Sequence, residues 1–338
     1  MKALIVAPSW IGDTIMAQPL FARLAERHPG LQLDALAPRW VAPVLQRMAE
    51  ISDVIDSPFG HGQVSLKARW RLAQELRARR YDAVYVLPNS LKSALVPWLA
   101  GIPRRVGFTG ESRYGLINVR HTLDKEALPL MVQRFVQLAE APGAAPVNGE
   151  FRPKIRSTAD EQQKTLTDLG LERPDRVVAF CPGAEYGPAK RWPAAHFAEL
   201  AKQLAARGYA IWLFGSPKDH AVAEEIAQLA PGVTRNLCGT TSLGQAVDLL
   251  ALADLVVCND SGLMHVAAAL DRPIVALYGS SSPGFTPPLS DRADIVSLKL
   301  ECSPCFKREC PLGHLDCLMK LSPAQVFAAC EKWIKPCP

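Results

Sequence analysis

The sequence predicts an α/β protein made of two similar halves, each containing a parallel β-sheet. Short apolar runs alternate with helical patterns, which is the signal for repeated βαβ units, and this alternation occurs in two separate series. A segment rich in proline, glycine and small residues, 141–158, lies between the two series and predicts a linker. The length of 338 residues also favours two domains.

The predicted strands are short apolar runs, each followed by a turn signal. They are 3–7, 31–37, 53–57, 81–87 and 104–108 in the first half, and 176–181, 209–214, 254–258 and 273–278 in the second. We therefore expect two Rossmann-like domains, 1–150 and 151–320, whose parallel sheets face a central cleft. Ligands of such folds bind beyond the carboxyl ends of the strands, so the loops that follow the strands are the candidate sites.

The last stretch, 321–338, predicts a terminal helix. Its Ser322 and Pro323 suit the N-cap and the first helical position, and the residues that follow are amphipathic. An amphipathic helix buries one face against a neighbour. We expect this helix to pack back on the N-terminal domain.

Composition excludes several classes of protein. A hydrophobic content of 49%, a charged content of 21% and a mean hydropathy of +0.04 exclude disordered and fibrous proteins. The N-terminal residues "MKALIVAPSWIGD" contain no small-residue cleavage site, which predicts a cytoplasmic protein. No apolar stretch approaches the ~20 residues that span a bilayer, so we expect any membrane contact to be peripheral.

Basic residues are concentrated in the first half. Residues 1–150 hold 18 Lys/Arg against 13 Asp/Glu, and the range from Lys67 to Lys125 holds 12 against four. Two interpretations stay open, a solvated helix surface and a surface for an anionic partner such as nucleic acid, anionic lipid or a phosphorylated glycan. Nucleic acid is disfavoured because no recognition motif or interleaved aromatic residues accompany the basic run.

Several nucleotide-binding motifs are absent from the sequence. No G-x-G-x-x-G follows any predicted strand, and no G-x-x-x-x-G-K-[ST] is present. D-x-D, the usual metal-nucleotide motif of one large class of glycosyltransferases, is missing as well. Dinucleotide-dependent redox enzymes and kinases are therefore disfavoured.

The turn after the first predicted strand contains a carboxylate, Asp13. In "VAPSWIGDTIMAQPL" (6–20) the chain leaves a buried strand, passes through Gly12 and Asp13, and enters a helical pattern near Thr14. Asp13 can cap that helix, or it can serve a ligand at the edge of the sheet.

Residues 258–270, "CNDSGLMHVAAAL", join a buried strand to an apolar helix through Asp260, Ser261 and Gly262. Backbone N–H groups and the positive end of the helix dipole suit a diphosphate there, and glycine allows its close approach. Ordinary capping by Asp260 or Ser261 is the alternative. His265 lies one turn into the helix, where a lone histidine is more often structural.

Two other turns of the second half carry candidate donors. In "CPGAEYGPAKRWP" (181–193), Lys190 and Arg191 stand at a helix entrance, where cations oppose the dipole and a bound anion would account for them; a solvent-exposed pair is the alternative. In "LFGSPKDH" (213–220), Ser216 or Asp219 suits a ribose, and N-capping explains them equally well.

The chain has nine cysteines. Four of them follow the pattern C-x2-C-x4-C-x6-C at Cys302, Cys305, Cys310 and Cys317, and His314 lies among them. A structural zinc site is one interpretation. Because only one pair has the spacing of a zinc knuckle, we favour reduced thiols in a proline-rich loop.

These segments together resemble glycosyltransferase family 9, the ADP-heptose:lipopolysaccharide heptosyltransferases. The likeness runs along nearly the whole chain, through "LIVAPSWIGDTIMAQPLF", "LPNSLKSALVPWLAGIPRRVGF", "CPGAEYGPAKRWP" and "NDSGLMHVAAALDRPIVALYGSSSP". The opening segment, the turn "EYGPAKRWP" and the cysteine loop resemble the type II members.

The resemblance implies a GT-B fold and inverting transfer of L-glycero-D-manno-heptose from ADP-heptose to the first heptose of the lipopolysaccharide inner core, through an α-1,3 link and without a catalytic metal or other cofactor. The N-terminal domain would bind a heptosyl-Kdo2-lipid A type acceptor at the anionic cytoplasmic face of the inner membrane. The C-terminal domain would bind ADP-heptose.

The resemblance also implies roles for the candidate residues. Asp13 is the expected catalytic base, and Gly12 leaves room for the acceptor sugar. The expected acceptor contacts are Lys92, Arg104, Arg105 and Arg113, and the expected donor contacts are Tyr186, Lys190, Arg191, Ser216, Asp219, Asp260, Ser261, Gly262 and His265.

Other functions fit parts of the sequence. A type I heptosyltransferase, another GT-B transferase or a nucleotide-sugar epimerase would share the two-domain architecture and differ in donor or acceptor. A two-domain ligand-binding protein of the periplasmic type is the non-enzymatic alternative, and it would need an export signal.

Overall fold

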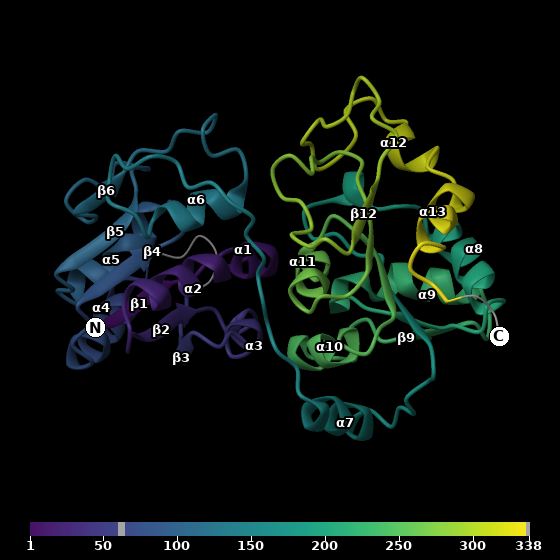
Figure 1. Cartoon of the computed structure of the whole chain (residues 1–338), viewed down its shortest axis with the longest axis horizontal. Helices are drawn as coiled ribbons and strands as arrows, with labels where there is room; N and C mark the ends of the chain where they lie inside the picture. The colour runs from purple at the N-terminus through teal and green to yellow at the C-terminus, as the bar shows by residue number, and fades with distance from the viewer. Residues whose placement is uncertain (60–64, 336–338) are drawn as a thin grey trace. The chain divides into compact units, whose positions relative to one another are not determined.

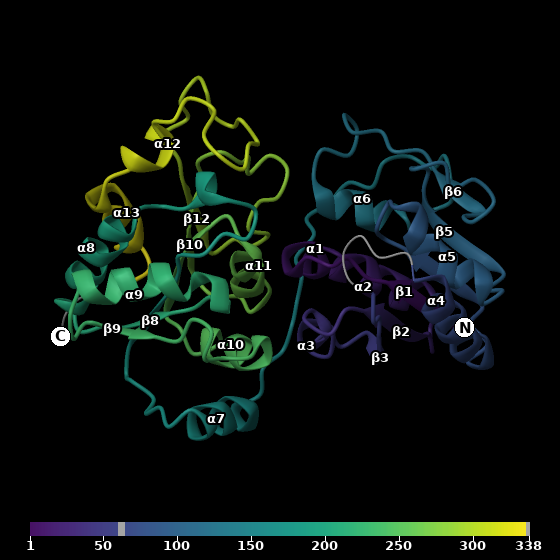
Figure 2. The same ribbon diagram turned by 180° about the vertical axis from the view of Figure 1, so that it is seen from behind.

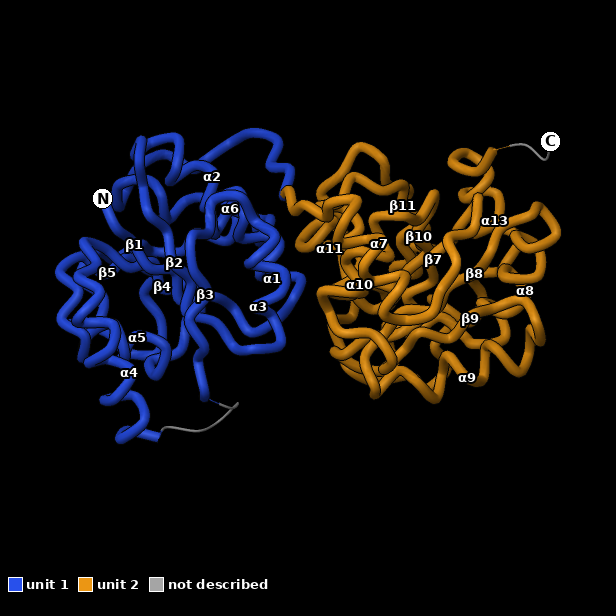
Figure 3. The backbone as a smooth tube through the Cα atoms, turned by 90° about the horizontal axis from the view of Figure 1, so that it is seen from below, with its two compact units in different colours: residues 1–153 blue, residues 154–338 orange. Residues whose placement is uncertain are grey.

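The computed structural model describes residues 1–59 and 65–335. It divides into two compact units, unit 1 (1–153) and unit 2 (154–338), coloured separately in Figure 3. The division falls inside the segment 141–158 that the sequence marks as a linker. Each unit is an α/β structure with its own sheet, and we describe each by itself.

Unit 1 contains a six-stranded sheet in the order β3-β2-β1-β4-β5-β6, and every neighbouring pair is parallel (Figure 1). The strands are β1 (Lys2–Val6), β2 (Gln32–Ala37), β3 (Ile51–Asp56), β4 (Ala83–Val86), β5 (Arg104–Phe108) and β6 (Val119–His121). The first five correspond to the predicted strands. The order changes direction between β1 and β4, where the connections of the sheet diverge.

Helices connect the strands of unit 1. They are α1 (Ile11–Met16), α2 (Gln18–Arg27), α3 (Ala42–Leu45), α4 (Leu66–Ala78), α5 (Leu91–Leu99) and α6 (Met131–Gln137). Buried side chains of α4 and α5 share one apolar cluster with Leu4, Val6 and Val84 of the sheet. Side chains alternate between the two faces of a strand, so Ala3 and Ile5 of β1 are buried on the opposite face.

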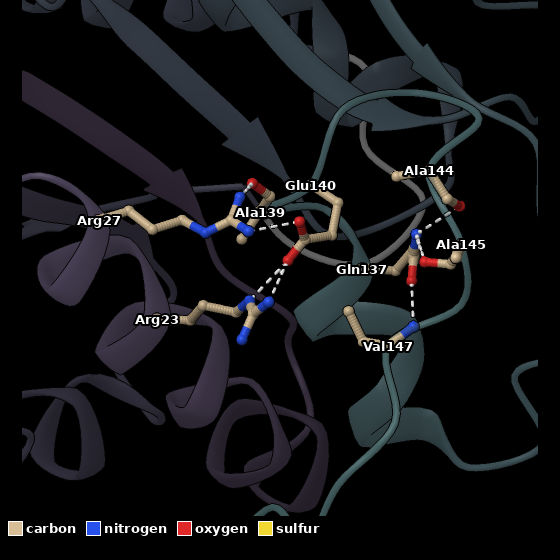
Figure 4. A network of polar contacts seen from close by, with 8 residues as sticks. All are labelled: Arg23, Arg27, Gln137, Ala139, Glu140, Ala144, Ala145 and Val147. Atoms are coloured by element: carbon tan, nitrogen blue, oxygen red, sulfur yellow. Dashed lines mark hydrogen bonds and ion pairs between the residues drawn. The ribbon is translucent and has the colours of Figure 1, made fainter.

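A polar network joins α6 and the following segment to α2 (Figure 4). Arg23 donates to Glu140 at 2.6 Å, and Arg27 donates to the same carboxylate and, at 2.6 Å, to the carbonyl of Ala139. The Gln137 side chain then accepts a hydrogen bond from the backbone of Val147 at 2.8 Å. The first residues of the predicted linker are thus fastened to unit 1.

Unit 2 repeats the architecture with the order β12-β11-β10-β7-β8-β9, again with every neighbouring pair parallel. The strands are β7 (Val177–Cys181), β8 (Ala210–Leu213), β9 (Thr234–Asn236), β10 (Leu255–Asn259), β11 (Ile274–Leu277) and β12 (Ala293–Val296). Four of them correspond to predicted strands. Two parallel sheets of this kind confirm the predicted fold class of two Rossmann-like halves.

The helices of unit 2 are α7 (Ala159–Asp168), α8 (Ala194–Ala205), α9 (His220–Leu229), α10 (Leu243–Leu250), α11 (Gly262–Ala269), α12 (Asp316–Met319) and α13 (Pro323–Cys330), with short 3₁₀ helices η1 (Pro188–Lys190) and η2 (Pro217–Asp219). Residues of α8, α9 and α13 share one buried cluster with the strands. Figure 2 shows these three helices from behind. Helices α7 and α10 contact each other outside that cluster.

The C-terminal helix contributes to the core of unit 2, and the expectation that it packs on the N-terminal domain stays a prediction. Ser322 caps α13 by accepting from the backbone of Gln325, as the Ser-Pro signal predicts. However, Val326 and Cys330 are buried in the core of unit 2, and α13 contacts α8. Its apolar face is therefore used inside the second unit.

Within residues 1–59 and 65–335, no helix is long and apolar enough to cross a bilayer.

Candidate functional site

The turn after β7 is anchored at both ends by one buried side chain, Asn259 at the end of β10. Its amide oxygen accepts from the backbone N–H of Trp192 at 3.1 Å, and its amide nitrogen donates to the carbonyl of Pro182 at 2.7 Å. Asn259 has no exposed surface. Asn259 was not predicted as a site residue, although it directly precedes Asp260 in the sequence. By these two bonds it fixes the turn that carries Lys190 beside the end of β10.

Lys190 and Asp260 form an ion pair at this edge of the sheet. The ammonium lies 2.6 Å from the carboxylate, and the two side chains are 17% and 4% exposed. Two predicted site residues, 70 positions apart in the sequence, are thus brought into contact. The ammonium has three donors, and the pair uses one of them, so two remain for a ligand. The ring of Tyr186 lies 5.2 Å from the same ammonium.

The start of α11 does not show the side-chain capping that the sequence left open. Ser261 occupies the N-cap position in an extended conformation, but its hydroxyl makes no capping hydrogen bond. The carboxylate of Asp260 is engaged with Lys190 instead. The backbone N–H groups that follow Gly262 therefore stay free of a side-chain cap, as an anion-binding helix start requires.

His265 is buried one turn into α11, and it is neutral. Burial lowers the pKa of its imidazole to about 4; the Asp260 carboxylate opposes that shift, and the Lys190 ammonium adds to it. An imidazole with this pKa carries no charge near neutral pH. It can contribute a hydrogen bond to a ligand, but it has no proton to give as an acid at that pH.

Asp219 and Ser216 form a capping box, the structural alternative considered for this turn. The carboxylate accepts from the backbone N–H of Ser216 at 2.9 Å and from its hydroxyl at 2.8 Å. Arg191 approaches Asp219 at 3.7 Å, and its buried Nε has no hydrogen-bond partner among the described residues. The guanidinium thus stands beside the same edge as Lys190 with a donor still available.

Unit 1 presents Asp13 at the carboxyl edge of its own sheet. Asp13 lies in the first turn of α1 and is partly exposed, whereas the N-cap position belongs to Trp10 and shows no side-chain capping bond. Thr14 bonds back to the carbonyl of Trp10 at 2.9 Å. Asp13 is therefore not the N-cap residue of this helix. Gly12, directly before it, is also partly exposed.

A cavity of about 110 Å³ opens at the same edge of unit 1, and Lys92 lines it. Its lining also includes Arg69, which the sequence analysis did not single out because it lies in a longer run of basic residues. Of the four charged residues predicted to contact the acceptor, Lys92 lines this cavity. The other three are Arg104, Arg105 and Arg113.

The three predicted arginines do not line this cavity, although Arg113 donates at 2.6 Å to the carbonyl of Pro88, which does. Arg104 and Arg105 stand at the start of β5, which is the amino end of a parallel strand. The guanidinium of Arg105 is bonded to the carbonyls of Ile102 and Leu116 at 2.7 Å each. Arg113 is 2% exposed, with bonds to backbone carbonyls that include 2.7 Å to Phe108.

These bonds give Arg105 and Arg113 structural roles, because each guanidinium satisfies main-chain oxygens of unit 1. Burial lowers the pKa of Arg113 from its ordinary value, and the nearby Glu111 carboxylate opposes that shift. The acceptor contacts of Arg105 and Arg113 stay a prediction, and Arg104 lies at the opposite edge of the sheet from Asp13.

Comparisons with known proteins match this arrangement of two sheets and two loop-bearing edges. The family model described as glycosyltransferase family 9 (heptosyltransferase) matches residues 69–316. The chain belongs to glycosyltransferase family 9. It is 47% identical to lipopolysaccharide heptosyltransferase 2 of Escherichia coli K12 over 97% of each chain. It is also 47% identical to lipooligosaccharide heptosyltransferase 2 of Haemophilus influenzae, over 88% of this chain and 89% of that one.

A solved structure of E. coli ADP-heptose lps heptosyltransferase II covers 98% of both chains with a TM-score of 0.90 and 44% identity. This match confirms the GT-B fold class expected from the resemblance. The family 9 model begins at residue 69, but the E. coli relative also covers the segment with Asp13.

This family 9 chain holds its cysteine loop against the turn that follows β7 in unit 2. We name residues 302–317 the cysteine segment. The hydroxyl of Tyr186 donates to the carbonyl of Phe306 at 2.9 Å, and the backbone N–H of Ala189 donates to the carbonyl of Arg308 at 3.0 Å. A Cβ at Gly187 would lie 2.5 Å from that Arg308 oxygen. Glycine is therefore required where the segment and the turn meet.

Cys302, Cys305, Cys310 and Cys317 line one cavity of about 20 Å³ and are free thiols. Backbone N–H groups, that of Leu315 first, lower the pKa of Cys310, whereas burial raises the pKa of Cys317. Across residues 1–59 and 65–335, no three His, Cys, Asp or Glu side chains are placed to hold a metal ion. The zinc site considered as an alternative has no ligand set of that size among these residues, and Cys337 lies outside them.

Proposed function

We propose that this chain is an inverting heptosyltransferase of the type II class. It transfers L-glycero-D-manno-heptose from ADP-heptose to the first heptose of the lipopolysaccharide inner core through an α-1,3 link. The observation that carries the proposal is the 47% identity, over 97% of each chain, to a protein named lipopolysaccharide heptosyltransferase 2. The 44% identical solved structure named for ADP-heptose supports the donor.

In this proposal unit 2 binds the donor. Lys190, held by Asp260, and Arg191 place cationic donors beside the start of α11, where the N–H groups after Gly262 and the hydroxyl of Ser261 also lie. These groups suit a diphosphate, and they stabilise the charge that develops on the departing ADP.

The remaining donor contacts are assigned to the same edge. Ser216 and Asp219 face the ribose, Tyr186 borders the diphosphate beside Lys190, and neutral His265 offers a hydrogen bond to the heptose or a phosphate oxygen. The capping box of Ser216 and Asp219 is compatible with a ribose contact, since a carboxylate accepts more than two hydrogen bonds.

Unit 1 binds the acceptor and supplies the base. The acceptor hydroxyl attacks the anomeric carbon of the heptose, Asp13 accepts the hydroxyl proton, and the bond from that carbon to the ADP oxygen breaks. Charge develops on both the sugar and the leaving diphosphate, as in other glycosyl transfers through an oxocarbenium-like transition state. No metal or redox cofactor takes part in the proposed step. Gly12 keeps the position next to the base free of a side chain.

The acceptor is a heptosyl-Kdo2-lipid A type molecule, and we propose that the enzyme meets it at the cytoplasmic face of the inner membrane as a peripheral protein. The support is the excess of basic residues in 1–150, which contain 18 Lys/Arg and 13 Asp/Glu, together with the anionic nature of such an acceptor. Cosedimentation with anionic and with neutral vesicles tests this: binding to the anionic vesicles alone, weakened by salt, is the expected result.

The experiment that tests the function supplies the purified protein with ADP-heptose and with acceptors that carry zero, one or two heptoses. We expect transfer only to the one-heptose acceptor. Mass spectrometry of the product then detects one added heptose, and NMR identifies the α-1,3 link. Transfer to the zero-heptose acceptor would instead indicate a type I enzyme. Turnover of a UDP-sugar without use of ADP-heptose would indicate another transferase or an epimerase. Binding of these sugars without any turnover would indicate a ligand-binding protein.

A further inference from the structure

Helices α4 and α5 lie side by side on one face of the sheet of unit 1 (Figure 1). Near their starts, Arg69 of α4 donates to the carbonyl of Lys92 of α5 at 2.9 Å. Near their ends, Arg77 of α4 donates to the carbonyl of Leu99 of α5 at 2.8 Å. The two helices therefore run in the same direction, and their outward surfaces adjoin.

Large apolar side chains are exposed on both helices. On α4 they are Leu66 and Trp70, which are 64% and 51% exposed, and on α5 they are Leu91 and Trp98, which are 39% and 48% exposed. Helical residues four or seven positions apart lie on the same side, so each helix shows its two residues on one side. Trp70 also shares a side of α4 with Arg77, which lies seven positions further on and reaches α5. The exposed apolar residues of α4 thus lie on the side next to α5.

The tryptophans of α4 and α5 differ from others of the chain in their hydrogen bonds. The indole N–H groups of Trp40, Trp192 and Trp333 each donate to a carbonyl or carboxylate oxygen. Those of Trp70 and Trp98 donate to no group within residues 1–59 and 65–335. A half-exposed indole with a free N–H suits the boundary between lipid tails and headgroups, where the ring meets apolar chains and the N–H meets polar groups.

Cations border these apolar side chains. Helices α4 and α5 contain one acidic residue, Glu75, and five basic residues, which are Lys67, Arg69, Arg71, Arg77 and Lys92. Lys67 and Arg71 are exposed and directly follow the two apolar residues of α4 in the sequence. Neither forms an ion pair with any residue of 1–59 or 65–335. Unpaired cations next to exposed indole and leucine side chains complement an anionic lipid surface.

We name this surface the α4–α5 face; its residues are Leu66, Lys67, Trp70, Arg71, Leu91 and Trp98. We propose that the α4–α5 face docks on an anionic lipid bilayer, with the two indole rings in the interface and the two cations against the lipid headgroups. The inference rests on the proposed function, because it takes the acceptor to be linked to lipid. It extends that function by naming the surface with which unit 1 meets the membrane.

The place of the α4–α5 face in the fold agrees with a lipid-linked acceptor. Helix α5 follows β4, so it begins at the carboxyl edge of a parallel sheet. Asp13 follows β1 at the same edge. A bilayer that contacts the α4–α5 face therefore lies along a surface that starts at the edge with the proposed base.

The test uses the full-length protein and two kinds of vesicle, phosphatidylcholine alone and phosphatidylcholine mixed with anionic phosphatidylglycerol. The apolar variant combines Trp70→Ala with Trp98→Ala, and the charge variant combines Lys67→Gln with Arg71→Gln. Heptose transfer to a water-soluble acceptor checks that each variant is folded. We expect this transfer to stay unchanged, because none of the four residues belongs to the proposed active site.

Two matched controls make the same kinds of change in unit 2. Lys202→Gln combined with Arg235→Gln removes two exposed cations. Leu229→Ser replaces a leucine that is 42% exposed, and it is compared with Leu91→Ser on the α4–α5 face, where the leucine is 39% exposed. Each control therefore differs from its counterpart in position and not in the chemistry of the change.

Cosedimentation measures the affinity for the anionic vesicles. We expect the charge variant to bind roughly 30-fold more weakly than the wild type, because each cation near an anionic surface contributes a factor of about five. We expect the apolar variant to bind at least about tenfold more weakly, since two large side chains no longer leave water. Leu91→Ser should weaken binding about threefold, and both controls should change it less than about twofold.

Brominated lipids distinguish a bilayer from a protein partner. Bromine on the lipid tails quenches tryptophan fluorescence at short range, so the fluorescence of the wild type should fall on the anionic vesicles and that of the apolar variant should not. If the α4–α5 face instead binds a second copy of this chain, sedimentation equilibrium without vesicles shows a dimer for the wild type and a monomer for the apolar variant. A dimer of this kind, without quenching by bromine, would overturn the proposal.

Equal vesicle affinity of the wild type and both face variants would also overturn it, as would an equal loss in the controls. In these cases the wild type still binds the anionic vesicles, so peripheral membrane association stands and only its surface is wrong. A wild type that binds neither kind of vesicle would overturn the association together with the α4–α5 face. The proposed heptose transfer is measured with a soluble acceptor, so it stands or fails independently of these results.

Discussion

The buried imidazole of His265 makes the stability of unit 2 depend on pH in a window that the structure defines. Its pKa is about 4 in the folded protein, chiefly because of burial, and the ordinary value is 6.5. Between these two values the unfolded chain binds a proton at this position and the folded chain does not. The free energy of unfolding therefore falls as the pH is lowered from about 6.5 to 4.

The size of the effect follows from the same two values. At pH 7 both states leave the imidazole almost entirely neutral, so it contributes little. At pH 5 the unfolded state is favoured by about 2 kcal/mol through this group alone, and at pH 4 by about 3 kcal/mol. A loss of 2 kcal/mol is a large part of the stability of an ordinary domain.

The comparison that isolates His265 is between the wild type and His265→Gln, which keeps a polar side chain but cannot titrate. Denaturant unfolding is measured at pH 7, 6 and 5. Trp192 and Trp212 are buried in unit 2, whereas the four tryptophans of unit 1 are each about half exposed, so fluorescence reports chiefly on unit 2. Because the carboxylates are common to both proteins, they cancel in the difference.

We expect the wild type to lose about 2 kcal/mol relative to His265→Gln between pH 7 and pH 5. If the two proteins keep a constant difference across this range, the imidazole is not held neutral by burial. The assignment of a neutral hydrogen-bonding group beside Asp260 would then be refuted.

Three further predictions address the proposed active site. Asp13→Asn should lower kcat by ~10²–10⁴-fold with an unchanged melting temperature, because the base is lost while a polar side chain of nearly the same shape is kept. Retained turnover would exclude Asp13 as the base. Lys190→Met should weaken ADP binding and destabilise unit 2 by about 3–5 kcal/mol. Adding Asp260→Asn should restore part of the stability but not the ADP binding. Calorimetry measures the binding, and denaturation measures the stability. Gly187→Ala should raise the KM for ADP-heptose at least about tenfold by displacing the cysteine segment. The control, Gly284→Ala, should leave this KM unchanged, because a Cβ there meets only a serine hydroxyl at 3.2 Å. Equal KM values for the two variants would show that the contact between Gly187 and the cysteine segment does not position the turn after β7.

The sheets were largely predictable because buried parallel strands are near-continuous apolar runs. The strands that were not predicted are β6, β9 and β12, each three or four residues long and placed toward an edge of its sheet. Segments such as "VRH" and "TRN" are too short to show any periodicity. Only their partners in the sheet reveal them.

The site was predictable to the extent that it follows strand ends. Lys190 and Asp260 each lie just after a predicted strand, and parallel strands bring such loops to one edge. Arg113 could not be judged in this way, because the sequence does not show that its guanidinium is enclosed by main-chain carbonyls. Asn259 and Arg69 were missed for the converse reason: their roles depend on partners far away in sequence.

The terminal helix shows a related limit of prediction from sequence patterns. Its amphipathic character indicates that one face is buried, but the pattern does not say which neighbouring element covers that face. The packing of α13 on α8 depends on the shape and position of the buried cluster of unit 2, which no local spacing expresses.

The place of α13 also affects the order in which the protein matures during synthesis. Leu321, Val326 and Ile334 belong to the same core as β7, which begins at Val177, so this core cannot close until residue 334 has been made. The sheet of unit 1 is complete at His121. Unit 1 can therefore fold on the ribosome while the core of unit 2 is still incomplete. A chain that stops before α13 leaves the apolar surface of α8 uncovered, which marks it for chaperones and proteases before it can bind a nucleotide sugar.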